Sequence, residues 1–381
     1  MMINIQNRRE CCGCAACVQR CPKQCISMQA DNEGFLYPVV DREKCVDCGL
    51  CEMVCPIINY GEKRTPLAVY AAKNTNEEVR LKSSSGGVFT LLAELVINGG
   101  GVVFGARFNE EWDVVHSYTE TIEGLAAFRG SKYLQSNIGD SYKKAEMLLK
   151  SGRKVLFSGT PCQIAGLRCY LRKEYENLLT VECVCHGVPS PKVWREYLKE
   201  VKANSRATSI QDVCFRDKST GWKGYSVSYK CKGKQDVYKR YSAQYYDNPF
   251  MRAFLGDFIL RPSCYSCVAK AGSSGADIAL ADFWGIEKIL PHFDDDWGCN
   301  LLIDYSGRVS YENGCELLAA SYEDAVKYNP AVVCSVYKPL NRDFFFFRLN
   351  KGRGCIGALD DTMSSGVLMR IYRMIYRKFF I

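Results

Sequence analysis

The chain has 381 residues, of which 22 are cysteine, with 47% hydrophobic residues and a formal charge of +8. This length predicts two or three domains, and the hydrophobic content is enough for sizeable cores. A long cysteine-rich chain without a signal peptide indicates a reducing, cytoplasmic compartment, in which thiols serve mainly as metal ligands or buried groups. No apolar run reaches the length of a membrane span, and no basic stripe interleaved with aromatic residues indicates a nucleic-acid partner.

Two cysteine runs occupy the first part of the chain. Each has the spacing C-x2-C-x2-C-x3-C followed by proline, which is typical of bacterial ferredoxins with two [4Fe–4S] clusters. In such ferredoxins the fourth cysteine of each run ligates the other cluster. The pattern predicts one cluster on Cys11, Cys14, Cys17 and Cys55, and a second on Cys45, Cys48, Cys51 and Cys21. Structural zinc knuckles are the alternative, since C-x2-C pairs also bind zinc, but zinc does not require the x3-C-P ending twice.

Residues 1–60 are therefore expected to form a ferredoxin-like domain. The Asp31–Gly34 turn, between two short β-prone stretches, predicts a small pair of strands within it. Cys12 and Cys25 fall outside the ligand pattern and are expected to pack beside a cluster. The polar stretch Gly61–Pro66 predicts a linker to the rest of the chain.

An α/β pattern begins at Leu67. Val69–Lys73 predicts a strand and Val88–Ile97 an apolar helix, with the Ser/Gly-rich turn Lys82–Gly87 between them. Free N–H groups at such a helix start suit a phosphate or pyrophosphate, although serine N-caps and glycine turns also occur without a ligand. A second polar turn, Arg129–Tyr133, combines two cations with an aromatic ring. It could hold an anionic cofactor, or it could be a solvated loop.

Four more cysteines lie at strand ends or turns of the α/β region. Cys162 and Cys185 each follow a predicted buried strand, and Cys264 and Cys267 form a third C-x2-C pair. Because the carboxyl ends of strands converge on one rim of an α/β sheet, four thiolates there could hold a third cubane cluster. A zinc site, a redox disulfide and plain buried thiols are the alternatives.

His186 is one of only three histidines and directly follows Cys185. It is a candidate proton carrier or a support for a cluster ligand, and a turn histidine bonded to backbone is the alternative. Near the other end, Gly366–Ile381 alternates arginine and lysine with large apolar residues. Such a basic amphipathic helix can lie on the inner face of an anionic membrane or dock a partner, and it can also pack on its own domain.

Six stretches together resemble the family of coenzyme F420 hydrogenase/dehydrogenase beta subunits, in the form with a two-cluster ferredoxin fused ahead of the flavoprotein domain. They are Lys82–Thr90, Arg129–Ser136, Ser158–Arg168, Cys185–Trp194, Arg261–Cys267 and Ala276–Ile286. The resemblance implies FAD bound through Ser85, Gly86, Gly87, Thr90, Arg129, Ser131 and Lys132. It also implies a third [4Fe–4S] cluster on Cys162, Cys185, Cys264 and Cys267. One departure is Ala281, which stands where the family has glycine before its Asp-Phe-Trp-Gly turn.

These patterns predict a multi-domain α+β protein, with a ferredoxin-like domain at 1–60, an α/β flavoprotein domain in two parts (67–150 and 151–340) and a basic tail at 341–381. The expected activity is that of an iron–sulfur flavoprotein oxidoreductase, which passes electrons between [4Fe–4S] clusters and FAD and exchanges a hydride with a deazaflavin-like or other small molecule. The expected protein partner is a redox protein or an associated oxidoreductase subunit. The alternatives are a non-catalytic electron-carrier or adaptor subunit and a reductase of surface-polysaccharide biosynthesis.

Overall fold

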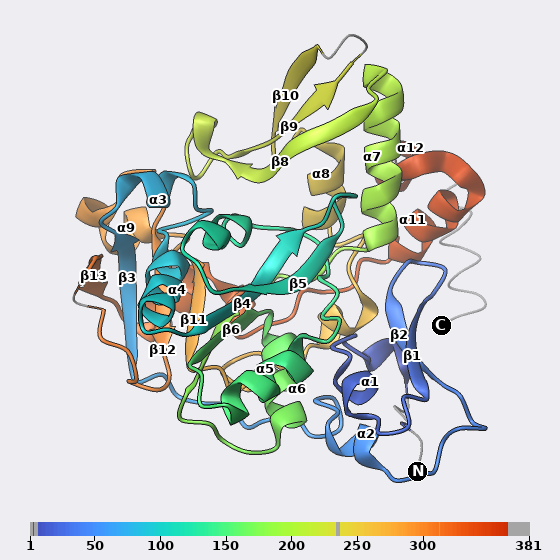
Figure 1. Cartoon of the computed structure of the whole chain (residues 1–381). Coiled ribbons are helices and arrows are strands. Elements are labelled where there is room, and N and C mark those ends of the chain that lie inside the picture. The colour runs from blue at the N-terminus through green and yellow to red at the C-terminus, as the bar shows by residue number, and fades with distance from the viewer. Residues whose placement is uncertain (1–2, 4–6, 234–236, 312, 365–381) are drawn as a thin grey trace.

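The computed structural model describes residues 3, 7–233, 237–311 and 313–364. It contains a two-stranded, a three-stranded and an eight-stranded sheet, arranged with the helices as Figure 1 shows. The fold is thus mixed α/β and multi-domain, with the cysteine-rich N-terminal region standing beside the large sheet. Within the described ranges, no helix is both long enough and apolar enough to cross a membrane.

The N-terminal module consists of two short helices and one antiparallel strand pair. Strands β1 (Ile26–Ala30) and β2 (Leu36–Val40) are joined by a turn at Asp31, whose carboxylate accepts hydrogen bonds from backbone N–H groups across the turn. Helices α1 (Ala16–Arg20) and α2 (Leu50–Met53) each begin after a residue with positive φ. The two cysteine runs therefore repeat the same local backbone geometry.

The eight-stranded sheet organises the rest of the chain. Its spatial order is β13 (Cys315–Ala319), β3 (Ala68–Asn74), β12 (Asn300–Asp304), β11 (Ile278–Asp282), β7 (Leu178–Cys183), β6 (Val155–Gly159), β4 (Val102–Phe108) and β5 (Val114–Thr119). The middle four strands are parallel and the outer ones antiparallel. Because β4 and β6 are neighbours, the two predicted parts of the α/β region share one sheet.

Helices cover both faces of this sheet, as its continuously apolar middle strands require. Leu156 of β6 packs into the core under α4 (Val88–Asn98), whereas the next residue, Phe157, packs under α5 (Ser141–Lys150) and α6 (Pro161–Leu171). The short helices are α3 (Glu77–Leu81), α9 (Ile286–Ile289) and α10 (Tyr322–Tyr328). With both faces buried, the strand ends are left as the accessible rim.

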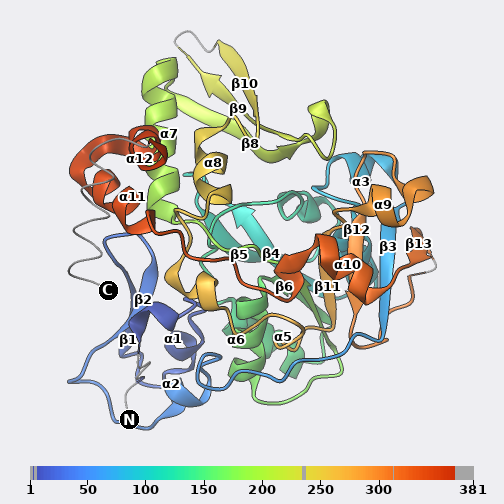
Figure 2. The ribbon, with the colours of Figure 1, turned by 180° about the vertical axis from the view of Figure 1, so that it is seen from behind.

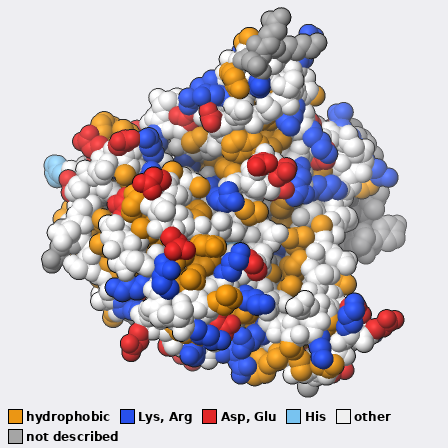
Figure 3. Space-filling view, in the orientation of Figure 1, with side chains coloured by type: hydrophobic (Ala, Val, Ile, Leu, Met, Phe, Trp, Pro, Cys, Tyr) orange, Lys and Arg blue, Asp and Glu red, His pale blue; other side chains and the backbone are white. Residues whose placement is uncertain are grey.

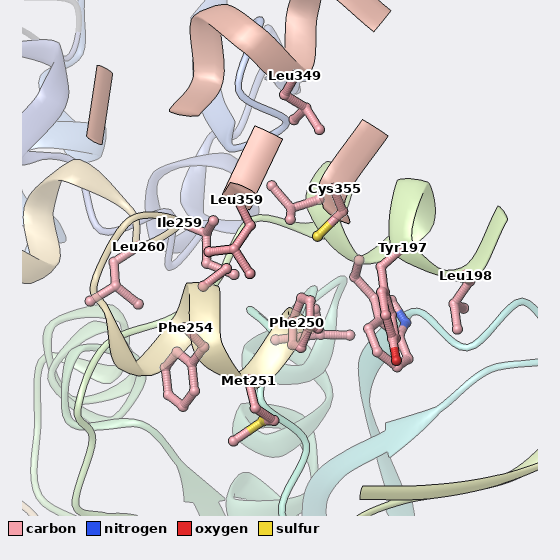
Figure 4. Close-up of a cluster of buried hydrophobic side chains, with 14 of the residues drawn as sticks. Tyr197, Leu198, Phe250, Met251, Phe254, Ile259, Leu260, Leu349, Cys355 and Leu359 are labelled. Atoms are coloured by element: carbon pink, nitrogen blue, oxygen red, sulfur yellow. The ribbon is translucent and has the colours of Figure 1, made fainter. Parts of the chain in front are cut away.

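The three-stranded sheet and four helices form a second hydrophobic core. The sheet consists of β8 (Ser209–Asp217), β9 (Ser226–Lys232) and β10 (Tyr238–Gln244), and the helices are α7 (Pro191–Ser205), α8 (Pro249–Leu255), α11 (Arg342–Arg348) and α12 (Gly354–Met363). In Figure 4, Tyr197 of α7, Phe250 of α8 and Cys355 of α12 point toward one another. This core joins elements that lie more than a hundred residues apart.

The tail predicted for 341–381 begins too early. Phe345, Cys355 and Leu359 are buried in the second core, so α11 and α12 are part of the folded domain. The aromatic run Phe344–Phe347 explains why, since three of its four rings are buried. The basic stretch Gly366–Ile381 lies outside the described residues, and its predicted role stays a prediction.

The predicted linker is held against the α/β region. The Arg64 guanidinium donates hydrogen bonds to the carbonyl oxygens of Ala276 (2.9 Å) and Tyr305 (2.7 Å). In Figure 2 this blue segment runs along the lower edge of the molecule to β3. Two ties on the other side of the module come from Arg342, which pairs with Glu33, and from Ser190, whose hydroxyl donates to the Glu33 carbonyl. The module is therefore docked rather than loosely tethered.

The net positive charge is spread rather than gathered into one stripe. In Figure 3, lysine and arginine side chains cover the lower part of the face, around α5, with acidic side chains among them. Ion pairs such as Lys150–Glu146 and Arg153–Glu120 account for part of this mixture. The visible face carries no basic band of the kind that tracks a nucleic-acid backbone.

Candidate functional site

One cavity in the module is lined by cysteines from both runs. Cys45, Cys48 and Cys51 of the second run meet Cys21 of the first, and we call these four the distal set. Cys48 is exposed and Cys45 half-buried, so this cavity opens toward the surface. Cys25 is buried beside it, with its Sγ 3.4 Å from that of Cys21.

A second cavity in the module is lined by Cys11, Cys14, Cys17 and Cys55, which we call the proximal set. All four are buried. Each cavity thus combines three cysteines of one run with the fourth cysteine of the other, which is the exchange that the ferredoxin spacing predicts. The role of these thiols as cluster ligands remains a prediction.

A third cavity of about 360 Å³ lies at the rim of the large sheet and is lined by Cys162, Cys185, Cys264 and Cys267, the third set. Cys162 begins α6 directly after β6, and Cys185 follows the adjacent parallel strand β7, so these two meet at the rim as predicted. Cys264 and Cys267 arrive differently. They lie in and after the 3-10 helix η5 (Pro262–Ser266), which precedes β11 instead of following a strand.

The thiols of the third set are poor free nucleophiles. Burial raises the pKa of Cys264 to about 12 and that of Cys267 to about 11. A hydrogen bond with the Cys12 thiol, together with burial, raises the pKa of Cys162. Such thiols become thiolates near neutral pH only where a metal replaces the proton, which favours a ligand role.

The spacing of these side chains bears on the kind of metal. Among the described residues, no three His, Cys, Asp or Glu side chains converge closely enough to hold a single ion. A cubane does not need such a point, because its four irons stand between the four thiolates. The cysteine-lined cavities therefore fit clusters better than mononuclear zinc.

The proximal and third cavities share a wall. Cys12 and Ile57 line both of them, and α1 of the module contacts α6 of the sheet domain there. Cys12 is buried, as expected of a residue packed beside a cluster ligand. These side chains form part of the wall between the module and the rim of the sheet.

His186 belongs to the third cavity. It lines that cavity, and its Nε2 lies 2.7 Å from Asp257 Oδ1, with Phe254 edge-on to its ring. A carboxylate partner orients the imidazole. No hydrogen bond among the described residues joins His186 to the predicted flavin turns, but Phe254 packs on both His186 and Tyr133, the residue after Lys132.

The two predicted flavin turns lie against each other. The Ser131 N–H donates to Ser84 Oγ at 2.5 Å, and Arg129 Nε donates to Thr90 Oγ1 at 3.2 Å. Thr90 lies in the first turn of α4, an 11-residue helix. The helix N-terminus and the cationic turn therefore form one surface, of the kind that suits an anion.

Three of the predicted flavin residues have structural partners of their own. The Ser85 hydroxyl donates to the Cys299 carbonyl at 2.7 Å. A Cβ on Gly86 would lie 2.4 Å from the Ala72 carbonyl oxygen, and Gly87 has a φ of +81°. These contacts require small or glycine residues in the turn even without a ligand.

The lysines of this surface fit an anionic group. The ammonium groups of Lys132 and Lys218 each donate to three main-chain carbonyl oxygens. Burial lowers the pKa of Lys132 to about 8 and that of Lys218 to about 7. Within the described part of the chain, neither pairs with a carboxylate. Lys132 is therefore a buried cation with no carboxylate beside it among the described residues, which favours the approach of an anion such as a pyrophosphate. The charges of Asp282 and Asp295, in contrast, already act on Lys218.

Sequence reasoning missed Arg216 and Lys218. Arg216 is buried between the rings of Tyr225 (3.9 Å from the guanidinium carbon) and Trp284 (5.1 Å). Its Nη2 donates to Asp282 Oδ1 at 3.1 Å, and its Nε has no hydrogen-bond partner among the described residues. The available signal was their position as charged residues at and just after the end of β8.

The departure at Ala281 leaves the neighbouring turn in place. Ala281 lies within β11, and its carbonyl accepts from Asn300 Nδ2 at 3.0 Å. The next residue, Asp282, ends the strand and binds Arg216, and Gly285 has the positive φ, +81°, that precedes α9. An alanine is thus accommodated at this position.

Two family models match the chain. Residues 10–57 match the 4Fe-4S dicluster domain, and residues 152–309 match the C-terminal part of the coenzyme F420 hydrogenase/dehydrogenase beta subunit. Residues 152–309 are thus similar to that family. A ferredoxin-type 4Fe–4S domain precedes them in this chain, so the resemblance expected from the sequence motifs is confirmed.

The relatives are oxidoreductases, oxidoreductase subunits or ferredoxins. One F(420)H(2) dehydrogenase subunit, from Methanosarcina mazei, is 23% identical over 204 residues, which are 50% of this chain and 58% of the relative. The coenzyme F420-dependent sulfite reductase of Methanocaldococcus jannaschii is 30% identical over 202 residues, 44% of this chain and 31% of the relative. The chain therefore spans less than two thirds of either protein.

Two further comparisons concern the module and one solved structure. The ferredoxin 7Fe of Hydrogenibacillus schlegelii is 44% identical over 43 residues, which are 11% of this chain and 49% of the relative. The F420-reducing [NiFe] hydrogenase complex from Methanosarcina barkeri contains a chain with a TM-score of 0.44 and 16% identity. That comparison covers 79% of this chain and 92% of the hydrogenase chain.

Proposed function

We propose that the protein is an iron–sulfur flavoprotein oxidoreductase that passes electrons between ferredoxin-type [4Fe–4S] clusters and FAD. The observation that carries this proposal is the succession of three cysteine-lined cavities, in which the proximal and third cavities share Cys12 and Ile57. When bound, the clusters would move single electrons and the flavin would exchange them for a two-electron hydride.

The cysteine sets differ in exposure, and this difference indicates which end of the row of cavities faces a partner. The distal set opens at the surface beside exposed Val46 and Met53, whereas the proximal set is buried. We therefore propose that a redox protein or an associated oxidoreductase subunit meets the chain at the distal set. The two exposed apolar side chains would form part of the contact.

The cationic surface at the start of α4 is the proposed site of the FAD pyrophosphate. Arg129, Lys132 and Lys218 would neutralise its charge, and the N-terminus of α4 would add its dipole. His186, oriented by Asp257, is the proposed proton carrier at the third cavity. The third set would hold the last cluster before the flavin.

A deazaflavin is the proposed hydride donor or acceptor. Two relatives carry coenzyme F420 in their names, and the matched family is named for it. Arg216, outside the predicted flavin set and buried between the rings of Tyr225 and Trp284, offers the cationic and aromatic contacts that an acidic, planar substrate needs.

Anaerobic purification with iron, sulfide and flavin measured per chain tests the proposal. About twelve irons and one FAD would support three cubane clusters beside a flavin, at four irons each. About eight irons and no flavin would contradict it.

A second candidate function is that of an electron-carrier subunit without its own catalysis. It is favoured by the relative named as a dehydrogenase subunit and by the structural partners that already account for Ser85 and Gly86. Adding a reduced deazaflavin to the isolated protein separates the two. Bleaching of the cluster absorbance would support the oxidoreductase, and an unchanged spectrum with all clusters present would support the carrier.

A further inference from the structure

Arg261 stands between the proximal and third cavities. Its side chain is 0% exposed, it lines the third cavity, and it directly precedes the 3-10 helix that carries Cys264. The Arg261 carbonyl accepts from the Cys264 N–H at 2.9 Å, and the Arg261 N–H donates to the Val188 carbonyl at 3.0 Å. Its backbone is therefore fixed to the third site.

The guanidinium reaches in the other direction, to the module. Nε donates to the Cys11 carbonyl at 2.7 Å and Nη2 to the Leu36 carbonyl at 2.8 Å. Nη1 donates to Gln135 Oε1 at 2.9 Å, and Gln135 Nε2 in turn donates to the Cys12 carbonyl at 2.8 Å. Arg261 and Gln135 together hold two consecutive carbonyls of the first cysteine run.

The cysteine run approaches this pair so closely that it needs glycine. Gly13 has a φ of +72°, and a Cβ there would lie 2.8 Å from Arg261 Nη1 and 2.8 Å from Gln135 Nε2. The guanidinium also lies over the Tyr37 ring, 4.4 Å from its centre. The planar group is thus packed closely against module atoms.

The charge of Arg261 has no protein counter-charge. Its hydrogen-bond acceptors are neutral carbonyl and amide oxygens, and in the described part of the chain no carboxylate pairs with it. Arg342, which is buried at the same interface, pairs with Glu33 instead. A guanidinium stays protonated in proteins, and an isolated buried cation is costly unless an anion lies near. Anionic thiolate clusters on both sides would supply that anion.

We propose that Arg261 is a positioning residue shared by the proximal and third sites. Its planar guanidinium fixes the separation of the two sites, and its positive charge raises the reduction potential of both sites relative to the distal site. This inference rests on the proposed function. The transfer concerned is one electron between neighbouring clusters, with no bond made and no proton moved, so the charge of Arg261 is constant throughout. Charge and hydrogen bonding near a cluster are known determinants of its potential.

Redox titration of the full chain followed by electron paramagnetic resonance tests both parts. In Arg261→Gln the midpoints of the proximal and third clusters should move to more negative potential, while that of the distal cluster stays in place. Arg261→Lys keeps the positive charge and loses the planar guanidinium with its directed N–H groups. It should keep the wild-type midpoints but change the signal splitting that neighbouring paramagnetic clusters cause. Arg342→Gln, at the same interface, is the matched control and should leave the order of the three midpoints unchanged.

The outcomes are separable. Equal shifts of all three midpoints, or none, in Arg261→Gln would overturn the electrostatic role. Unchanged signal splitting in Arg261→Lys would overturn the positioning role. If Arg261→Gln does not fold, Arg261→Lys alone tests the proposal. A wild-type protein with about eight irons would contradict the proposed third cluster. The proximal midpoint would still report on Arg261 in that case.

Discussion

The module and the rim of the sheet gather cysteines in different ways. In the module, three thiols of each set lie within seven residues, at Cys11–Cys17 and Cys45–Cys51, so the local backbone holds them together. At the rim, Cys162 and Cys185 meet only because β6 and β7 are parallel neighbours, and Cys264 arrives from a separate 3-10 helix. The sites of the module depend on the spacing of cysteines in the sequence, and the site at the rim depends on the topology of the sheet.

This difference extends to what stabilises each region. The small core beside the distal set consists largely of the cysteines themselves, with Ile26. The sheet domain has apolar cores on both faces, independent of any ligand. We therefore expect the module to depend on its clusters and the sheet domain to fold without them.

The largest expected effect comes from a substitution in the third set that leaves the module intact. Cys264→Ser should remove about four irons per chain and leave about eight. The serine hydroxyl cannot replace the thiolate ligand of the third cluster, and the two clusters of the module are not affected. Electron transfer from a distal one-electron donor to the flavin should be lost. Iron analysis and stopped-flow reduction measure the two results. Cys315→Ser, on the edge strand β13, is the control and should retain all irons. Loss of all irons in Cys264→Ser would show that the two regions are not independent.

Removal of iron should unfold one region only. Treating the protein with a chelator under air should expose the backbone amides of β1, β2 and α1 to hydrogen exchange, because fewer than about sixty residues with a cysteine core retain little stability without metal. The amides of β6 and β7 should stay protected. Hydrogen exchange read by mass spectrometry resolves the two regions. Equal loss of protection in the sheet would contradict the comparison.

The docking between the regions should carry a measurable free energy of unfolding. Glu33→Gln removes the closer of the two carboxylates beside the buried Arg342 and leaves only Asp343, whose Oδ1 lies 3.5 Å from Nη1. Breaking a buried pair in this way costs about 3 kcal/mol. Denaturant unfolding of the holo-protein measures the change. Glu78→Gln removes an exposed pair with Lys82 and should leave the free energy of unfolding nearly unchanged. Similar small values for both would show that the docking pair is not a stabilising contact.

The smallest expected effect is a pH dependence at the flavin surface. Burial lowers the pKa of Lys132 to about 8, so without an anion the folded protein binds fewer protons than the unfolded chain between pH 8 and the ordinary lysine value of 10.5. Stability of the flavin-free protein should accordingly rise as the pH rises through that window.

Flavin binding should show the opposite trend. The pyrophosphate favours the protonated form of Lys132, so FAD binding should raise the pKa of this lysine. As the pH rises above about 8, the affinity for FAD should therefore fall, in total by about tenfold for each unit by which binding raises that pKa. Fluorescence titration of FAD at about pH 7 and about pH 9, on either side of that value, measures this. Lys132→Met should flatten the dependence, and Lys150→Met, on the exposed end of α5, should not. An unaltered slope in Lys132→Met would place the pyrophosphate elsewhere.

The sequence predicted the parts of the molecule that depend on neighbouring residues. The strand predicted at Val69–Lys73 is part of β3 and the helix predicted at Val88–Ile97 is α4 to within one residue, because their apolar patterns are local. The two cysteine cavities of the module follow from spacing in the same way. Cys162 and Cys185 could be brought together by reasoning from parallel strands.

The rest depends on partners distant in the chain. The antiparallel strands β12 and β13 were not predicted, since each is short and is defined by pairing with β3, more than two hundred residues earlier. Arg261 contacts the Cys11 carbonyl across 250 residues, and nothing in its local motif indicates that partner. Lys218 is likewise recognisable only from the backbone carbonyls that surround it.

The pairing of Arg342 with Glu33 sets an order of events during synthesis. The two residues are 309 positions apart, so the ribosome has made nearly all of the described chain before this contact can form. Until then, the module is held only by contacts from residues made earlier, such as Gln135, Ser190 and Arg261. The last helices to be made therefore complete the docking of the module instead of starting it.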